Sequence, residues 1–313
     1  MFIIKYKWIF LTISAVLVFG SLILIGTKGI KKSIDFTGGT EVVVSYNGYT
    51  STPEGKIDLN FIKDNLVKNN FSVKDVSVQK QNLDGSMLVD IKLTGDLPND
   101  QRQNFENAWS FNHDSHYEAK QVSETTIGPS IGKELTQKAF LSIILVALVI
   151  ILFIAFSFSS VSKPVSSWKY GLIAIVTLVH DVAIPTGMYA VLGQRNGAEV
   201  DSLFVIALLT IMGISIADTI VVFDRIRENL KNRKSGENFP EIVGHSLSQT
   251  LLRSFNTSFA VVLVLISLFY FGPASIHNFA LTLIVGMIVG TYSSIFVASP
   301  LLVLVEKWQR KGK

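Results

Sequence analysis

Six long apolar segments dominate the hydrophobic pattern of the 313-residue chain. A membrane-spanning α-helix needs about 20 mostly apolar residues, and the segments that reach this length are roughly 8–27, 137–158, 168–191, 201–223, 254–272 and 277–300. We interpret the first as a retained anchor, because Gly26-Thr27-Lys28 is a poor signal-peptide cleavage site. The pattern predicts a polytopic α-helical membrane protein with about six transmembrane helices.

Residues 28–133 are polar and contain no apolar run of span length, which predicts one domain outside the membrane. Alternation of apolar and polar residues predicts strands there, and apolar residues at helical spacing predict helices. Along the chain, we expect a strand at Glu41–Tyr46, a helix at Ile57–Asn70, strands at Phe71–Val78 and Met87–Leu93 around the turn Asp84-Gly85, a helix at 98–109 and a strand at Tyr117–Val122. This order predicts an α+β ferredoxin-like domain between the first and second transmembrane helices.

Basic residues gather near one set of helix ends, as the positive-inside rule describes for the cytoplasmic side. The short loops at the opposite ends hold only Arg195. We therefore predict a cytoplasmic N-terminus and first helix at 1–27, an external domain at 28–133, a five-helix bundle at 134–302 and a basic cytoplasmic tail at 303–313. Both termini and the 224–253 loop would then be cytoplasmic. The basic residues are Lys5, Lys7, Lys163, Lys169, Arg225, Arg227, Lys231, Arg233, Lys234, Arg253, Lys307, Arg310, Lys311 and Lys313.

The composition supports a membrane protein and excludes several kinds of site. Only 17% of the residues are charged, against about 25% in an ordinary soluble domain. The absence of cysteine excludes disulfides, thiolate catalysis and cysteine-ligated metals. We find no GxxxxGK[ST] loop for ATP and no nucleic-acid module, and we expect no cofactor.

Asp181 lies near the middle of the apolar run Trp168–Tyr189. A carboxylate at the centre of a membrane helix costs at least about 2.5 kcal/mol, so such acids usually face the protein interior and mark ion or proton pathways. A permanently neutral acid that bonds between helices is the structural alternative. His180 projects about 100° away along the helix, and it either shares the pathway or packs as a neutral histidine.

A second acid, Asp218, lies in the next apolar run. Ser215, Asp218 and Arg225 follow helical spacing and share one face, which can meet Asp181. An acid opposed by a cation inside a membrane can switch between paired and protonated states, so we predict that Asp181, Asp218, Arg225 and His180 form an ion-coupling group. The alternative for Arg225 is ordinary cytoplasmic anchoring under the positive-inside rule. The sequence favours this alternative more strongly for Arg227 than for Arg225.

Three further polar or small-residue patterns lie near the apolar segments. Asp35, Phe36, Gly38 and Gly39 belong to the run DFTGGT beside the first segment, where two glycines make either a hinge or a plain turn. The spacing of Gly286, Gly290 and Ser294 predicts close helix packing. A polar seam or interhelical hydrogen bonding is expected from Ser215, Thr219, Asn256 and Thr257, and the sequence does not choose between these.

The motifs DFTGGT at 35–40, VHD at 179–181 and GISIADTIVVFDRIREN at 213–229 closely resemble those of the SecD/SecF family, which is related to the resistance–nodulation–division transporters. The resemblance covers essentially the whole chain and is to the separate SecF form. It implies a subunit that joins SecD and the SecYEG channel in the bacterial cytoplasmic (inner) membrane, in contact with membrane lipid. There it would use the ion-motive force to help move unfolded polypeptide outward. The essential acid and arginine of the family carry over to Asp181 and Arg225, with Asp218 in the matching motif.

Other readings of the sequence remain open. A half-size exporter of small molecules or lipids is the main alternative, although such exporters usually carry about twelve spans and two external domains in one chain. An intramembrane aspartyl protease would need a GxGD-type motif beside its acid, whereas Asp181 follows Val179-His180, so we expect no enzymatic activity. A purely structural scaffold does not explain the cost of a buried Asp181. Both H⁺ and Na⁺ suit a carboxylate beside hydroxyl groups.

Overall fold

The computed structural model describes residues 2–47, 59–81, 86–110, 118–157, 165–233 and 236–311. The chain divides into two compact units. One consists of Met1–Lys31 with Phe140–Lys313, and the other is Lys32–Ala139. The predicted turn Asp84-Gly85 lies outside the described residues.

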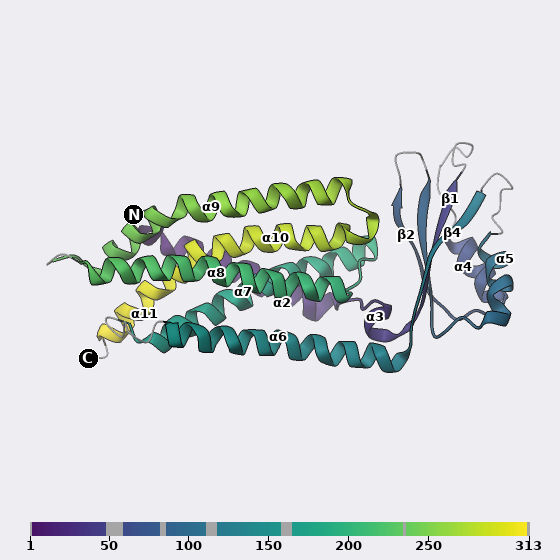
Figure 1. Ribbon diagram of the computed structural model, residues 1–313, viewed down its shortest axis with the longest axis horizontal. Helices are drawn as coiled ribbons and strands as arrows, with labels where there is room; N and C mark the ends of the chain where they lie inside the picture. Colours follow the sequence, from purple (N-terminus) through teal and green to yellow (C-terminus); the bar gives the residue numbers. More distant parts are fainter. Residues whose placement is uncertain are drawn as a thin grey trace. The chain divides into compact units, whose positions relative to one another are not determined.

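Within these ranges, six helices are long and apolar enough to cross a membrane, as the hydrophobic pattern predicts (Figure 1). The sixth is continuous through one π-helical turn, and a short helix α1 (Phe2–Lys5) precedes the first. The six are α2 (Lys7–Lys28), α6 (Pro129–Ser157), α7 (Ser167–Asn196), α8 (Ser202–Lys231), α9 (Phe239–Phe271) and the run of η2 (Ala274–Ile276), α10 (His277–Ser293), η3 (Ser294–Ala298) and α11 (Ser299–Lys311).

Several helices extend well beyond their apolar segments. α6 begins at Pro129, and α9 begins at Phe239. The prediction of a loop over residues 224–253 is therefore wrong, because most of this segment is helical. At the start of α9, the Asn238 and Glu241 side chains cap each other's backbone amides. Such a capping box stabilises a helix start that hydropathy alone does not detect.

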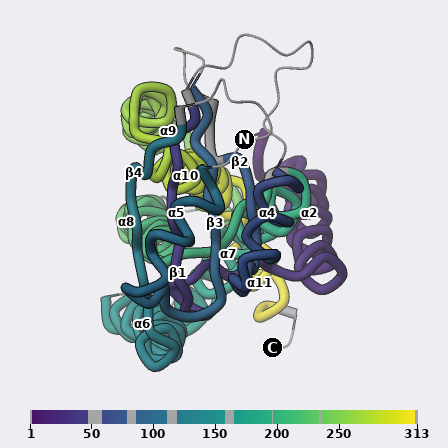
Figure 2. Tube along the Cα trace, turned by 90° about the vertical axis from the view of Figure 1, so that its right-hand side faces the viewer, coloured from purple at the N-terminus to yellow at the C-terminus, as the bar shows by residue number. Residues whose placement is uncertain are grey.

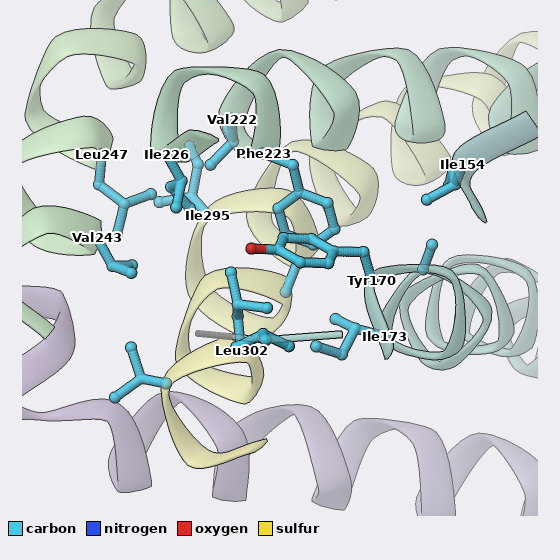
Figure 3. Close-up of a cluster of buried hydrophobic side chains, with 14 of the residues drawn as sticks. Ile154, Tyr170, Ile173, Val222, Phe223, Ile226, Val243, Leu247, Ile295 and Leu302 are labelled. Atoms are coloured by element: carbon cyan, nitrogen blue, oxygen red, sulfur yellow. The ribbon is translucent and has the colours of Figure 1, made fainter. Parts of the chain in front are cut away.

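The core of the helical unit lies where α7, α8 and the η3–α11 segment meet (Figure 3). Tyr170 of α7 and Phe223 of α8 make an edge-to-face ring contact with centroids 5.2 Å apart. Ile226 and Leu302 lie in the same cluster and are fully buried. In contrast, α6 and α9 leave most of their apolar surface uncovered by this chain. The central helices are therefore the place where a polar group would be shielded.

The second unit contains a four-stranded sheet, counted over its described residues. The strands are β1 (Gly39–Asn47), β2 (Val73–Gln81), β3 (Met87–Leu93) and β4 (Glu118–Ile127), and the helices are α3 (Ile34–Thr37), α4 (Leu59–Lys68), η1 (Asn99–Gln101) and α5 (Arg102–Ser110). All neighbouring strands pair antiparallel in the order β2-β3-β1-β4. The predicted sequence of strands and of the two longer helices is confirmed.

Helices α4 and α5 cover one face of this sheet (Figure 2). Val42, Val44 and Tyr46 alternate along β1 and point into the core beneath these helices, as a strand's period of two requires. The Tyr46 hydroxyl donates to the Trp109 carbonyl at 2.7 Å. Burial raises the pKa of Tyr46, so this hydroxyl remains a donor at neutral pH.

Candidate functional site

The carboxylate of Asp181 is fully buried and is bonded by side chains from two other helices. Ser293 Oγ at the end of α10 donates to Oδ2 at 2.8 Å, and Ser215 Oγ on α8 donates to the same oxygen. His180 Nδ1 lies 2.9 Å from Oδ1. The predicted meeting of Asp181 with the Ser215 face of the next span is confirmed, whereas Ser293 is a partner that the sequence analysis missed.

His180 is adjacent to Asp181, yet its ring turns back to bond the same carboxylate. If Nδ1 carries the proton donated to Asp181, then Nε2 holds a lone pair. That Nε2 is buried and has no hydrogen-bond partner among the described residues. The ring stacks on Tyr292 with centroids 6.1 Å apart, and the Tyr292 hydroxyl donates to the Phe10 carbonyl at 2.9 Å. Tyr292 of α10 thus packs against the His180 ring, and α2 fixes Tyr292 through the Phe10 carbonyl.

A chain of hydroxyls continues from Ser215 along the α8–α10 contact. Thr219 Oγ1 donates to the Ser215 carbonyl at 3.1 Å and lies 2.9 Å from Ser294 Oγ. Ser294 Oγ also donates to the Gly290 carbonyl at 3.0 Å. Thr219, which we expected in a polar seam, therefore belongs to the buried network around Asp181.

Small residues on α10 let these helices approach. A Cβ added at Gly290 would lie 3.1 Å from the Cβ of Ser215, and one added at Gly286 would collide with Ile211. The predicted close packing at Gly286, Gly290 and Ser294 is confirmed. The helix is π-helical from Ser294 to Ala298, and π turns occur frequently at functional sites.

Asp218 lies one turn after Ser215 on α8 and is half-buried. Ser254 Oγ on α9 donates to its Oδ1 at 2.5 Å. Its Oδ2 is buried and has no hydrogen-bond partner in the described part of the chain. Arg253, the residue before Ser254, also has a favourable electrostatic effect on this carboxylate, after those of the Ser254 and Ser294 hydroxyls. From the sequence, Arg253 is expected only as one of the cytoplasmic basic residues.

The structure gives Arg225 partners other than the intramembrane acids. Its Nε donates to Gln249 Oε1 at 2.6 Å, and one terminal nitrogen bonds Glu228 Oε2 at 2.5 Å. Arg225 is ten residues beyond Ser215, which is about 15 Å along a helix. The predicted interaction of Arg225 with Asp181 is therefore not present in this structure. Arg227 likewise turns to Asp224, at 3.7 Å.

The Asn256 and Thr257 side chains are exposed on this chain, and their expected role in a polar seam or in interhelical hydrogen bonding stays a prediction. The residues of α9 that face the bundle are instead Ser254 and Ser258, and Ser258 Oγ lies 2.5 Å from Thr291 Oγ1 on α10. The sequence does contain a signal for this face. Hydroxyl residues recur there at every fourth position, namely Ser246, Thr250, Ser254 and Ser258.

The DFTGGT run forms the short helix α3 and the start of β1. Asp35 lies in the first turn, where its amide donates to Ser33 Oγ at 3.2 Å, and the Phe36 carbonyl accepts a 3.4 Å bond from Thr136. Gly38 and Gly39 have φ angles of 72° and 130°. A Cβ on Gly39 would lie 2.5 Å from the Leu93 carbonyl oxygen. Close packing within this unit accounts for the two glycines and provides no support for a hinge.

The comparisons with known proteins agree on one family. The profile described as "Protein export membrane protein SecD/SecF, C-terminal" matches residues 108–308, and the "SecD/SecF GG Motif" profile matches residues 23–48. The protein translocase subunit SecF of Thermobaculum terrenum is 36% identical over 99% of this chain and 94% of its own length. The subunit SecF of Haemophilus influenzae is 33% identical over 91% of this chain and 80% of its own length.

Solved structures give the same result for the fold. The crystal structure of SecDF from Thermus thermophilus superposes with a TM-score of 0.79 at 31% identity, over 97% of this chain and 38% of that chain. This chain thus spans well under half of the SecDF chain. SecDF in the form named super-membrane-facing gives a TM-score of 0.62 at the same identity. The chain belongs to the SecD/SecF family of protein-export membrane proteins.

Proposed function

We propose that this chain is a SecF-type subunit that works with a SecD partner and the SecYEG channel. It would use the ion-motive force to promote late steps of polypeptide translocation, and it would not be an enzyme. The observation that carries the proposal is the fully buried Asp181 carboxylate, bonded by Ser215 and Ser293. A membrane protein retains such a group at a cost of about 2.5 kcal/mol or more, and ion coupling explains that cost.

The hydroxyl network suggests how a proton on Asp181 would move helices. An ionised carboxylate only accepts hydrogen bonds, whereas a protonated one must also donate one. Protonation of Asp181 therefore requires one of its three partners, the Ser215 hydroxyl, the Ser293 hydroxyl or His180 Nδ1, to accept a hydrogen bond from the acid. Ser215 lies at the α8–α10 contact, where its carbonyl accepts from Thr219 and Ser294, and we propose that the rearranged bonding at Asp181 favours a different α8–α10 contact. This change would be the conformational step.

We also propose that Asp218 and Arg253 take part in ion coupling. The unpartnered buried oxygen of Asp218 is a candidate acceptor for a proton or a small cation, and Arg253 would supply the opposing charge expected from Arg225. Both H⁺ and Na⁺ suit this site. Asp218 and Ser215 lie on the same face of α8, so occupancy at Asp218 and protonation at Asp181 act on one helix.

We further propose that the unit Lys32–Ala139 is a ferredoxin-like domain on the external side of the bacterial inner membrane. The strand order β2-β3-β1-β4 and the two helices on one face support the fold. The clustering of basic residues near the opposite helix ends supports cytoplasmic termini. There the domain would hold or release the emerging polypeptide. A reporter at the C-terminus that reads as external would contradict this orientation.

The test is Asp181→Asn, assayed as gradient-dependent completion of export in vesicles with SecD and SecYEG. Asn keeps the shape but cannot cycle a proton, so we expect the stimulation by the gradient to disappear. Asp201→Asn is the matched control, because Asp201 caps the start of α8 and Asn caps equally well. Stimulation that survives in Asp181→Asn, with normal insertion and SecD binding in both variants, would overturn the proposal.

A further inference from the structure

A groove of about 950 Å³ lies in the helical unit between α2, α7 and the η3–α11 segment. Its walls are almost entirely apolar. Trp8 and Phe19 line it from α2, and Ile175 lines it from α7. Gly20 forms part of the α2 wall, and a Cβ added there would meet no atom within 4 Å. The groove is therefore open space along membrane-spanning helices.

One end of the groove is basic and aromatic. Trp8 and Leu304 line that end, next to Lys7 in the sequence and one helical turn before Lys307. Across from them, Lys169 Nζ lies 5.9 Å from the Trp308 ring and donates to Gln309 Oε1 at 3.1 Å. Glu306, the acid on this part of α11, is buried. Exposed charge at this end is thus positive.

We propose that this groove binds an anionic phospholipid, with an acyl chain along α2 and α7 and the phosphate at Lys7, Lys169 and Lys307. The apolar walls alone do not select a lipid, because lipid tails are as apolar as leucine side chains. Selection comes from the head group, since basic pockets between transmembrane helices bind anionic head groups. Trp8 and Trp308 occupy the interfacial level where aromatic residues anchor a protein. His180, a member of the predicted ion-coupling group, also lines the groove, but lipid binding is measured without an ion gradient.

Native mass spectrometry of the purified full chain tests the proposal, with phosphatidylglycerol and phosphatidylcholine added in equal amounts. We expect the phosphatidylglycerol adduct to dominate. Each lysine near an anionic surface contributes about fivefold in affinity, so Lys169→Gln should lower the preference for phosphatidylglycerol by about that factor. Equal adducts of both lipids, with no effect of Lys169→Gln, would overturn the proposal.

Gly20→Leu gives a second, independent test, because leucine fits there and fills the groove. Gly26→Leu is the matched control on the same helix, since its Cβ also meets no atom within 4 Å and it does not line the groove. We expect loss of the adduct in Gly20→Leu and retention in Gly26→Leu. An unchanged adduct in Gly20→Leu would exclude the groove as the site. Release of lipid on addition of a SecD partner would identify a subunit interface and would also contradict the proposal.

Discussion

Asp181 and Asp218 lie within the apolar segments of the helical unit, and the surroundings of their carboxylates differ. Asp181 is fully buried, and both of its oxygens are bonded. Asp218 is half-buried, with one oxygen bonded to Ser254 and the other unpartnered among the described residues. The first carboxylate is enclosed by α7, α8 and α10, and the second lies between α8 and α9, a helix whose apolar surface this chain leaves mostly uncovered.

The difference teaches that the two acids are suited to different tasks. A fully bonded, enclosed carboxylate can change its charge only if its partners reorient together. A partly bonded one, close to the exposed Arg253, can exchange a proton or cation with little rearrangement. Asp218 is thus suited to ion entry, and Asp181 is suited to convert occupancy into helix movement. Four predictions test this division.

The largest effect on stability is expected when each acid is removed. Asp181→Ala leaves Ser215 and His180 without their shared partner, while Ser293 keeps its bond to the Gly290 carbonyl, and each unsatisfied buried group costs about 1–3 kcal/mol. We expect a loss of about 3 kcal/mol or more in the free energy of unfolding, measured by SDS titration in mixed micelles. Asp218→Ala, which frees only Ser254, should cost about 1 kcal/mol. Equal losses would show that the two environments do not differ in the way described.

The next effect concerns the close α8–α10 contact that positions Ser215. Gly290→Ala adds a methyl group 3.1 Å from the Ser215 Cβ, and such overpacking costs about 1–3 kcal/mol. We expect that loss together with weaker gradient stimulation, because Ser215 moves away from Asp181. Gly213→Ala on α8 is the control, since its Cβ meets no atom within 4 Å. If Gly290→Ala and Gly213→Ala have the same stability and the same gradient stimulation, the α8–α10 contact has space for a methyl group at Gly290.

A smaller effect separates the hydroxyls that bond Asp181 from hydroxyls elsewhere. Ser293→Ala removes one of the hydrogen bonds to Asp181, at a cost of about 1 kcal/mol. Ser258→Ala removes only the contact with Thr291, and hydrogen bonds between transmembrane helices average about 0.6 kcal/mol. Gradient-stimulated export should fall in Ser293→Ala and persist in Ser258→Ala. A fall in both would indicate a general packing defect.

The sequence predicted that Asp181 is a buried functional acid, because it lies within an apolar run. It also predicted the contact with Ser215, because the helical spacing of the next span places Ser215 on a face that can meet Asp181. Ser293 could not be assigned in the same way, because its role depends on which helices pack together. Hydroxyl residues at every fourth position from Ser246 to Ser258 mark the face of α9 that bonds to other helices of this chain, and Asn256 and Thr257 lie outside that face.

The fold was predictable to a similar degree. Strands β1 and β3 lie within a few residues of the expected ranges, because alternation marks a half-buried sheet. The polar starts of α6 and α9 were missed, since hydropathy detects only the part of a helix that crosses the membrane. The last strand continues to Ile127, beyond its expected end at Val122. The residues of β4 after Val122 are mostly polar, so the alternation of apolar and polar residues that marks a strand stops before the strand ends.

The smallest change in stability is expected for substitutions of Arg253 and Arg225. These variants nevertheless decide which of the two arginines interacts with Asp218. Arg253 is exposed, so Arg253→Gln should alter the free energy of unfolding by no more than about 0.5 kcal/mol. Its charge acts on Asp218, and we therefore expect gradient-stimulated export to be lost. Arg225→Gln breaks the bonds to Gln249 and Glu228 at a comparably small cost, and stimulation should survive. The reverse outcome, with Arg225→Gln inactive and Arg253→Gln active, would restore the pairing expected from the sequence. It would also show that α8 must move far enough during the cycle to bring Arg225 to an acid that it does not contact in this structure.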